Sequence, residues 1–297
     1  MASFGHLITA MVTPMDRALA VDYDRAGALA KRLVDSGSDG LVVSGTTWES
    51  PTLSDEEKIR LFRTVREAVG ARAKVIAGTG TYNTAHSIHL THEAERVGCD
   101  GVLLVNPYYN KPSQEGLYQH FKAVAESTSL PVMLYNIQSR TSVNCEPATI
   151  ARLAQIRNIV AVKESSGNLD QMSLIRKLTP PEFHLYSGDD SLTLPLLAVG
   201  GTGVVSVASH LAAREIKAMI QAFHAGDVRR ALDLHLRLWP LFKVIFITTN
   251  PTPVKAALAM AGFDVGGLRL PLIEATAKER DQIAAVLKEL ALLPVAA

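Results

Sequence analysis

The sequence predicts an α/β protein, a (β/α)8 TIM barrel with a C-terminal appendix of three helices. Eight short apolar runs alternate with stretches of helical periodicity, at about 30 residues for each pair, as expected of a chain of βα units. The runs are apolar at consecutive positions, which is typical of parallel strands covered by helices on both faces. Eight such units close into a barrel. An open doubly wound sheet is disfavoured, because no glycine fingerprint opens the first unit.

The predicted strands are rich in aliphatic residues and end in polar, turn-forming ones. They cover residues 6–12, 40–45, 74–77, 101–105, 131–134, 159–163, 183–186 and 203–207. Helical spacing follows the first strand over residues 22–34. Ser54 precedes the next helix, and Glu57 three residues later completes the pattern of a capping box.

The pattern changes after residue 224. Three helical stretches follow without strands between them, over residues 227–246, 252–260 and 275–292. We therefore predict a catalytic barrel over residues 1–225 and a C-terminal helical region over residues 226–297. This region is expected to be an appendix to the barrel and not a nucleotide-binding domain.

The composition disfavours several classes of function. The chain has 297 residues, of which 47% are hydrophobic, and its formal net charge is +1. It can build a large core, but its charge gives no basis for binding nucleic acid or an anionic membrane. No apolar run is long enough to span a bilayer, and no signal peptide is recognisable. Cys99 and Cys145 are far apart, as expected of free thiols in a reducing compartment, so we expect a cytoplasmic protein.

Lys163 stands at the carboxyl end of the sixth predicted strand, directly after four apolar residues. Desolvation disfavours the charged form of a buried amine. A lysine that loses its proton in this way is a nucleophile for carbonyl groups. The structural alternative is a lysine that extends to solvent or pairs with a neighbouring carboxylate. Active sites of such barrels lie at the carboxyl ends of the strands, so Lys163 is the candidate nucleophile.

The other predicted strand ends carry hydroxyl groups and glycines. With Lys163 they form the predicted rim of the barrel, which consists of Thr46, Thr47, Gly80, Tyr109, Tyr135, Gly188 and Ser206. This rim contains no cluster of His, Asp and Glu for a divalent metal. Because side chains alternate along a strand, Lys163, Tyr135 and Thr46 are expected to converge if their faces point to the barrel axis.

These rim residues also have structural interpretations. Thr46 and Thr47 are suited to capping a turn. Tyr135 has the pattern of a core aromatic whose hydroxyl reaches water. The pair Tyr108-Tyr109 would suit a subunit interface.

Two charged residues near the rim also allow more than one interpretation. Arg140 follows the fifth strand, where a guanidinium can bind a carboxylate in a bidentate way or simply face solvent. Asp190 follows the seventh strand and is expected to be the N-cap of the next helix.

Taken together, the strand ends resemble those of one family. The matching segments are Gly45-Thr46-Thr47, residues 106–112, Tyr135-Asn136 with Arg140-Thr141, Lys163-Glu164 with Gly167-Asn168, and residues 187–190 and 250–255. In order and spacing they are similar to dihydrodipicolinate synthases, which are pyruvate-dependent Schiff-base aldolases. The resemblance covers nearly the whole chain. Residues 108–112 and 250–255 favour this family over the related N-acetylneuraminate lyases and keto-deoxy sugar acid aldolases.

The resemblance implies a class I lyase. It would condense pyruvate with L-aspartate 4-semialdehyde to 4-hydroxy-tetrahydrodipicolinate, for diaminopimelate and lysine biosynthesis. No cofactor is implied beyond the covalent imine between Lys163 and pyruvate, and no metal. The implied assembly is a homotetramer built as a dimer of dimers.

The resemblance also assigns roles to individual residues. Tyr135, Thr46 and Tyr109 would form a proton relay, with Tyr109 supplied by the neighbouring subunit. Thr46 and Thr47 would bind the pyruvate carboxylate, and Arg140 would bind the carboxylate of the aldehyde. Gly188 and Val205 would contact the lysine and pyruvate.

The sequence departs from the family pattern at three places. Trp48 replaces a glycine, so it would narrow the pocket, turn outwards to an interface, or impair catalysis, and a positive φ there would cost about 1–3 kcal/mol. Gln138 replaces a proline and Ser142 replaces a glycine. These two replacements bear on the direction in which Arg140 points and therefore on the choice of second substrate.

The third departure concerns regulation. The family's lysine-inhibited members carry His, Asn and Glu at an effector site, where this chain has Asp55, Lys58, Tyr82 and His86. We therefore expect no inhibition by free lysine. The alternatives to a synthase are another pyruvate-dependent aldolase, of the N-acetylneuraminate or 2-keto-3-deoxy sugar acid type, and a pyruvate-binding homologue that Trp48 has impaired.

Overall fold

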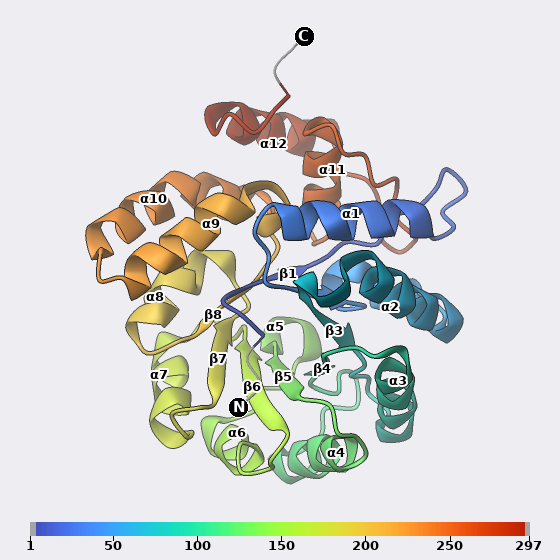
Figure 1. Cartoon of the computed structure of the whole chain (residues 1–297), viewed down its shortest axis with the longest axis vertical. Helices are drawn as coiled ribbons and strands as arrows, with labels where there is room; N and C mark the ends of the chain where they lie inside the picture. The colour runs from blue at the N-terminus through green and yellow to red at the C-terminus, as the bar shows by residue number, and fades with distance from the viewer. Residues whose placement is uncertain (1–3, 295–297) are drawn as a thin grey trace.

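Eight parallel strands form a closed barrel in the computed structural model, which describes residues 4–294 (Figure 1). The strands are β1 (Leu7–Ala10), β2 (Gly40–Val43), β3 (Lys74–Gly78), β4 (Gly101–Val105), β5 (Val132–Asn136), β6 (Ile159–Glu164), β7 (His184–Ser187) and β8 (Gly203–Ser206). Each strand pairs with the next along the chain, and β8 pairs with β1. The predicted (β/α)8 barrel is confirmed.

Helices surround the barrel (Figure 1). Those up to the last strand are α1 (Tyr23–Asp35), α2 (Asp55–Val69), α3 (Thr84–Val97), α4 (Gln114–Glu126), α5 (Gln138–Thr141), α6 (Pro147–Leu153), α7 (Leu169–Leu178) and α8 (Thr193–Ala198). Their starts follow from the sequence. Asp22 accepts a hydrogen bond from the Arg25 amide at α1, and Ser54 and Glu57 form the predicted capping box at α2.

Four helices follow the last strand. They are α9 (Ser209–His224), α10 (Val228–Val244), α11 (Thr252–Met260) and α12 (Ala277–Glu289). α10 lies along α9, and α11 and α12 lie together at the top of the view in Figure 1. The three helices predicted after residue 224 are present, with ends that differ by a few residues. The division into parts at residue 225 stays a prediction.

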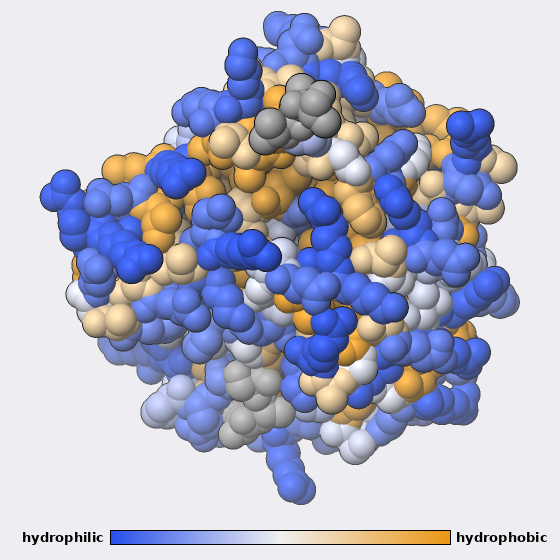
Figure 2. Space-filling model, turned by 45° about the horizontal axis from the view of Figure 1, so that its top comes forward, coloured by the Kyte–Doolittle hydropathy of each residue, from blue (hydrophilic) through white to orange (hydrophobic). Residues whose placement is uncertain are grey.

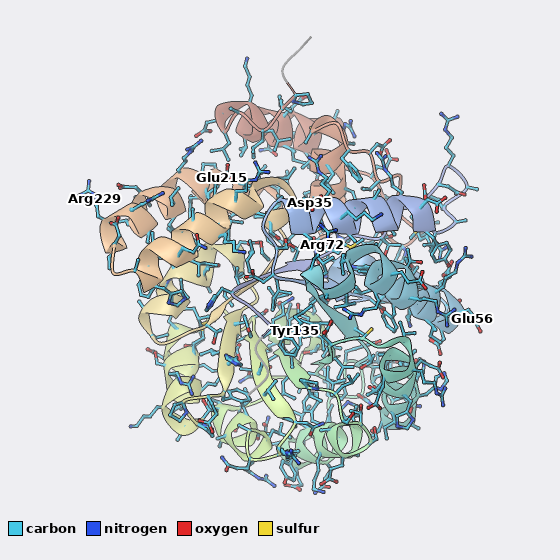
Figure 3. All side chains as sticks on the ribbon, in the orientation of Figure 1. Asp35, Glu56, Arg72, Tyr135, Glu215 and Arg229 are labelled. Carbon is cyan, nitrogen blue, oxygen red and sulfur yellow. The ribbon has the colours of Figure 1, made fainter. Side chains whose placement is uncertain are left out.

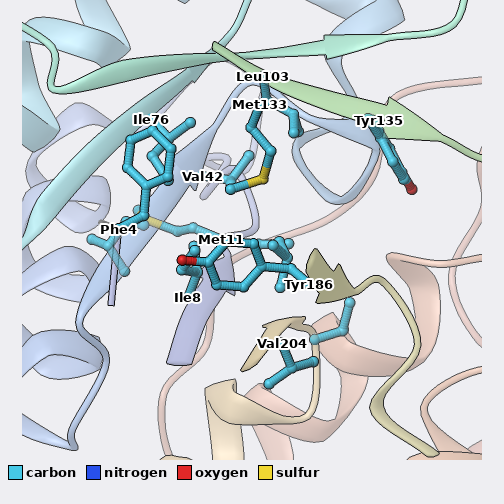
Figure 4. Packing of buried hydrophobic residues seen from close by; sticks show 14 of the residues in the cluster. Phe4, Ile8, Met11, Val42, Ile76, Leu103, Met133, Tyr135, Tyr186 and Val204 are labelled. Atoms are coloured by element: carbon cyan, nitrogen blue, oxygen red, sulfur yellow. The ribbon is translucent and has the colours of Figure 1, made fainter. Parts of the chain in front are cut away.

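The interior of the barrel is filled by side chains. Figure 4 shows Met11, which directly follows β1, and Val42, Leu103 and Met133 of β2, β4 and β5 pointing toward one another. All four are buried. Tyr135 follows Met133 on the same face of β5, nearer the carboxyl end. The barrel therefore has a packed floor, and reactive groups can lie only above it.

Four strands extend further at their carboxyl ends than the sequence pattern predicts. β5 includes Tyr135 and Asn136, and β3, β6 and β7 each gain one residue, Gly78, Glu164 and Ser187. A β-carbon at Gly78 would lie 2.3 Å from the carbonyl oxygen of Ser44, so only glycine allows this approach of the two strand ends. Within residues 4–294, no helix is both long and apolar enough to cross a membrane.

Candidate active site

A cavity of about 240 Å³ opens beside the carboxyl ends of β2 to β5. It is lined by Ser44, Gly45, Thr46, Ser50, Pro51, Gly78, Gly80, Leu103, Val105, Tyr108, Tyr135, Ile137, Arg140 and Thr141. Three predicted site residues, Thr46, Tyr135 and Arg140, thus share one cavity. The lining is a mixture of hydroxyl groups and apolar side chains with one guanidinium, as suits a small carboxylate-bearing ligand.

Lys163 lies next to this cavity, behind Tyr135. Its Nζ lies 4.0 Å from the centre of the Tyr135 ring, and the two residues are paired in the register of β5 and β6. Both are buried. The predicted convergence of Lys163 and Tyr135 is therefore confirmed, and Tyr135 connects the lysine with the cavity.

Gly188 and Ser165 lie close to the lysine on the β7 side. A β-carbon built at Gly188 would lie 2.9 Å from Lys163 Cε and 1.7 Å from Ser165 Oγ. A side chain at residue 188 would therefore displace either the lysine or the serine. Val205 is buried in β8, directly before Ser206 at the end of the strand.

The two threonines predicted to bind a carboxylate occupy a single 3-10 turn, η1 (Thr46–Trp48). Thr46 lines the cavity, whereas Thr47 is buried behind it. Asn250 Nδ2 donates a hydrogen bond of 2.9 Å to Thr47 Oγ1. Because this oxygen accepts from Asn250, its own proton remains available for a ligand.

A buried ion pair supports the threonine turn. Glu49 follows the turn with φ 58°, and its carboxylate lies 2.6 Å from Lys255 Nζ. Both side chains are almost completely buried. Burial lowers the pKa of Lys255, and the Glu49 carboxylate opposes this shift. Arg269 donates its amide to the same carboxylate and its guanidinium to Glu57 on α2, so the turn is tied to distant parts of the chain.

Trp48 is fully buried in the core and does not line the cavity. Its φ is not positive; the left-handed residue is the next one, Glu49. Thr13 Oγ1 donates a hydrogen bond to the Trp48 carbonyl, whereas the buried indole Nε1 has no partner within the described residues. The condition for backbone strain at Trp48 is therefore not met, and the ring neither narrows the cavity nor faces outwards.

The pair Tyr108-Tyr109 is divided between two environments. Tyr108 lines the cavity, and its ring makes an edge contact of 5.1 Å between centroids with Tyr82. Tyr109 is 93% exposed and has φ 70°. Within one chain, Tyr109 is therefore not brought together with Lys163, Tyr135 and Thr46.

Arg140 belongs to α5, a single helical turn after β5. The turn ends at Ser142 with φ 57°, in the left-handed region that favours glycine. Thr141 anchors it through hydrogen bonds to the carbonyls of Ile137 and Val143. The exposed guanidinium thus lies at the cavity on a turn whose backbone is fixed from both sides.

A polar network lies under the Arg140 turn, outside the barrel wall. Asn136 Nδ2 donates to Glu164 Oε2 at 2.9 Å and to Asn144 Oδ1, while its Oδ1 accepts from Asn106. Burial raises the pKa of Glu164, and hydrogen bonds from Asn136 and Ser166 oppose this shift. The network joins the ends of β4, β5 and β6, which fixes Tyr135 and Lys163 relative to each other.

Three of the four residues at the predicted effector positions, Asp55, Lys58 and His86, lie together. His86 Nε2 lies 2.7 Å from Asp55 Oδ2, and Lys58 Nζ lies 3.5 Å from Asp55 Oδ1. The hydrogen bond from His86 lowers the pKa of Asp55 against the opposing effect of burial. The Asp55 carboxylate is therefore already engaged with two nitrogen groups. Tyr82 is exposed nearby in sequence and contacts Tyr108.

The predicted capping role of Asp190 is wrong. Asp189 caps the turn after β7 by accepting from Ser191, and the Asp190 side chain turns inwards. Its carboxylate accepts hydrogen bonds from the Ser206 hydroxyl and from two backbone amides that follow β8. Burial raises the pKa of Asp190 to about 6. Asp189 is therefore the N-cap, because its side chain faces the first amides of the turn.

The cavity also contains residues that sequence reasoning did not select. The sequence pattern indicates only an interface role for Tyr108 and assigns no role to Ser44 or Ser50, although all three line the cavity and the two serines share a hydrogen bond of 3.0 Å. Ser165 beside Lys163 was also missed. The alternation that selected Lys163 predicts Ser165 on the same face two residues later, so a signal for Ser165 existed. Within residues 4–294, no group of three or more His, Cys, Asp and Glu could hold a metal ion.

Comparison with known proteins gives one consistent family. The model of the dihydrodipicolinate synthetase family matches residues 3–290. A 4-hydroxy-tetrahydrodipicolinate synthase of Desulforudis audaxviator is 61% identical over 290 residues, which cover 98% of this chain and 99% of the relative. A dihydrodipicolinate synthase structure from Bacillus anthracis superposes with a TM-score of 0.95 at 51% identity, covering 97% and 99% of the two chains. A structure from Cyanidioschyzon merolae with lysine bound has a TM-score of 0.96 at 47% identity, covering 98% and 99%.

Proposed function

Because this chain belongs to the dihydrodipicolinate synthetase family, we propose that it condenses pyruvate with L-aspartate 4-semialdehyde through an imine on Lys163. The chain is a lyase of this family. The observation that carries the proposal is the placement of Lys163 Nζ, 4.0 Å from the Tyr135 ring centre at the carboxyl end of the barrel. Around it stand the hydroxyl groups and the arginine that such a reaction needs.

Imine formation starts with attack of the neutral Lys163 amine on the ketone carbon of pyruvate. Loss of water from the resulting carbinolamine requires proton transfer to the leaving hydroxyl. Tyr135 and Thr46, which line the cavity beside the lysine, carry that proton in our proposal. Loss of a methyl proton then gives the enamine, and its carbon attacks the aldehyde. Cyclisation and transimination release 4-hydroxy-tetrahydrodipicolinate and regenerate the free amine.

The threonine turn binds the pyruvate carboxylate in this proposal. Thr47 Oγ1 accepts from Asn250 and therefore directs its own proton elsewhere. The backbone amides of a tight turn add further donors for an anion. Gly188 and Val205 complete the surroundings of the imine, and the missing side chain at Gly188 leaves room for the Ser165 hydroxyl beside Lys163 Cε.

Arg140 is proposed to hold the carboxylate of the aldehyde at the entrance. If so, Arg140→Ala raises the KM for aspartate semialdehyde by roughly tenfold to a hundredfold, since a charged hydrogen bond worth about 1.5–3 kcal/mol is lost. Arg152→Ala is the matched control, because Arg152 is an exposed arginine paired with Glu115 outside the cavity. A steady-state assay of both variants, with pyruvate saturating, measures the effect.

The choice of second substrate is tested in the same assay with competing aldehydes. We expect turnover with aspartate semialdehyde and at most traces with N-acetylmannosamine or glyceraldehyde. Faster turnover with either sugar aldehyde would assign the chain to the other aldolases instead. The alternative of a pyruvate-binding homologue impaired by Trp48 is no longer favoured, because Trp48 is buried away from the cavity.

Insensitivity to free lysine stays part of the proposal. Asp55 is paired with His86 and Lys58, so the ammonium of Lys58 occupies the carboxylate that an added cation would seek. We expect unchanged initial rates as L-lysine is raised to millimolar concentrations. Inhibition at submillimolar lysine would overturn this part and leave the catalytic proposal standing.

The assembly is proposed to be a homotetramer, a dimer of dimers, in which Tyr109 completes the neighbouring subunit's site. Tyr109 is 93% exposed on its own chain, which is unusual for an aromatic side chain with a catalytic role and is explained if a second subunit covers it. A cytoplasmic location and the division at residue 225 also remain predictions.

A further inference from the structure

Ser165 is the polar group next to Lys163 that the proposed reaction does not yet use. Its Oγ is buried and has no hydrogen-bond partner within the described residues. A buried hydroxyl without a partner costs free energy and therefore calls for an explanation. The side chains of Ser165 and Lys163 are close, because both lie within 3 Å of one point, the position of a β-carbon built at Gly188.

The surroundings of Lys163 make the serine distinctive. On the β5 side, the Lys163 amine faces the ring of Tyr135. On the β7 side, Gly188 contributes no side chain, and the Ser165 hydroxyl fills the space above it. Ser165 therefore supplies a polar atom where β7 itself leaves a gap.

Ser165 is held in place by its own loop. Its amide donates a hydrogen bond of 2.9 Å to the Asn136 carbonyl, and Glu164 before it is anchored by Asn136 and by the Ser166 amide. The backbone that carries the hydroxyl is thus fixed to β5, the strand that carries Tyr135. A fixed hydroxyl restricts the positions of a flexible neighbour more effectively than a mobile one.

We propose that Ser165 is a positioning residue for Lys163. Its hydroxyl, which has no partner among the described residues of the free chain, accepts a hydrogen bond from the Lys163 ε-amine when the amine turns to attack pyruvate, and so holds the amine between Tyr135 and Gly188. This rests on the proposed function. It assigns to Ser165 a share in imine formation and none in binding of the aldehyde. No bond to Ser165 is made or broken.

The test separates imine formation from the later steps. Enzyme and pyruvate are mixed and quenched with borohydride at increasing times, and the reduced adduct is followed by intact mass. Ser165→Ala removes only the oxygen and is expected to slow adduct formation at saturating pyruvate about fivefold, as loss of one hydrogen bond predicts. The KM for aspartate semialdehyde and the melting temperature are expected to stay unchanged.

Ser166→Ala is the matched control. The Ser166 hydroxyl accepts a local hydrogen bond from the Asn168 amide and is expected to leave adduct formation at the wild-type rate. A wild-type rate in Ser165→Ala overturns the inference, as does an equal slowing in both variants or a slowing accompanied by a lower melting temperature. Absence of an adduct in the wild type would instead overturn the proposed function itself.

Discussion

Lys163 owes its reactivity in our account to the side chains around it at the end of β6. The amine lies 4.0 Å from the ring centre of Tyr135, and on the opposite side Gly188 adds no side chain, so only the small Ser165 side chain lies beside Lys163 Cε. These neighbours are small or flat where they meet the lysine. Pyruvate, a three-carbon acid, can therefore approach an amine that is otherwise enclosed by the barrel.

The pKa of the Asp190 carboxyl, at the same end of the barrel, gives a test of the electrostatics of this region. Burial raises the pKa of this carboxyl to about 6, above its ordinary value of 3.8. The folded state then binds the proton more tightly than the unfolded chain, so the stabilising contribution is complete below about pH 4 and is lost as pH rises through 6.

Asp190→Asn is therefore expected to flatten the stability profile between pH 4 and pH 7. The wild type should lose on the order of 2–3 kcal/mol over this range relative to the variant, since one pKa unit corresponds to about 1.4 kcal/mol. The amide can still accept from the backbone after β8 and donate to Ser206. Urea unfolding at several pH values measures the difference, and parallel profiles of the two proteins would refute the assignment.

Trp48 is predicted to serve stability and not catalysis. Trp48→Gly empties a large buried site and should lower the free energy of unfolding by about 3–5 kcal/mol. Because the ring does not line the cavity, kcat of the folded variant should remain within a few fold of the wild type. Denaturant unfolding and steady-state kinetics at a low temperature give both values. A large gain in kcat would show instead that the indole obstructs the site.

At the scale of elements, strand ends were predictable and loops less so. Apolar runs followed by turn residues located the strands. The alternation of side chains along β5 and β6 correctly predicted that Tyr135 and Lys163 face each other. The orientation of Asp190 and the burial of Trp48 could not be predicted, because each depends on contacts with distant parts of the chain. For Trp48 such a contact comes from Thr13, which follows β1.

The threonine turn depends on the Glu49–Lys255 pair, which joins η1 to α11. Lys255→Met leaves the buried Glu49 carboxylate without its cation and should cost about 3–5 kcal/mol of stability. The double variant Glu49→Gln with Lys255→Met should recover most of this loss, because no buried charge remains. A double-mutant cycle in urea measures the coupling. If the losses of stability in the single variants Glu49→Gln and Lys255→Met add up to the loss in the double variant, the pair does not act as a unit.

At the scale of the whole molecule, the closed barrel was predictable from eight repeated units, whereas the homotetramer is predicted from the family resemblance alone. One chain leaves Tyr109 exposed and also exposes apolar residues on one face of α10, namely Val228, Leu232, Leu236 and Trp239. Figure 2 shows apolar side chains among charged ones over the upper part of the molecule, and Figure 3 places charged residues such as Arg229 at its periphery with Tyr135 near its centre. Surface exposure alone does not specify which copy covers which face.

The α10 face is expected to belong to a subunit interface. Leu236→Glu should therefore shift the sedimentation coefficient toward a smaller species, because a carboxylate would be buried against apolar side chains. Asp233→Glu, a nearby conservative change at an exposed position of α10, is the matched control. If Leu236→Glu sediments like the wild type, the α10 face is not an interface.

The proposed chemistry depends most directly on one covalent bond, between Lys163 and pyruvate. The decisive measurement is borohydride reduction in the presence of pyruvate, followed by digestion and mass spectrometry of the lysine-containing peptides. Our account predicts a reduced pyruvyl adduct on Lys163, none on the other buried lysines Lys58 and Lys255, and none anywhere in Lys163→Ala. Absence of an adduct in the wild type, or an adduct on a different lysine, would contradict the account.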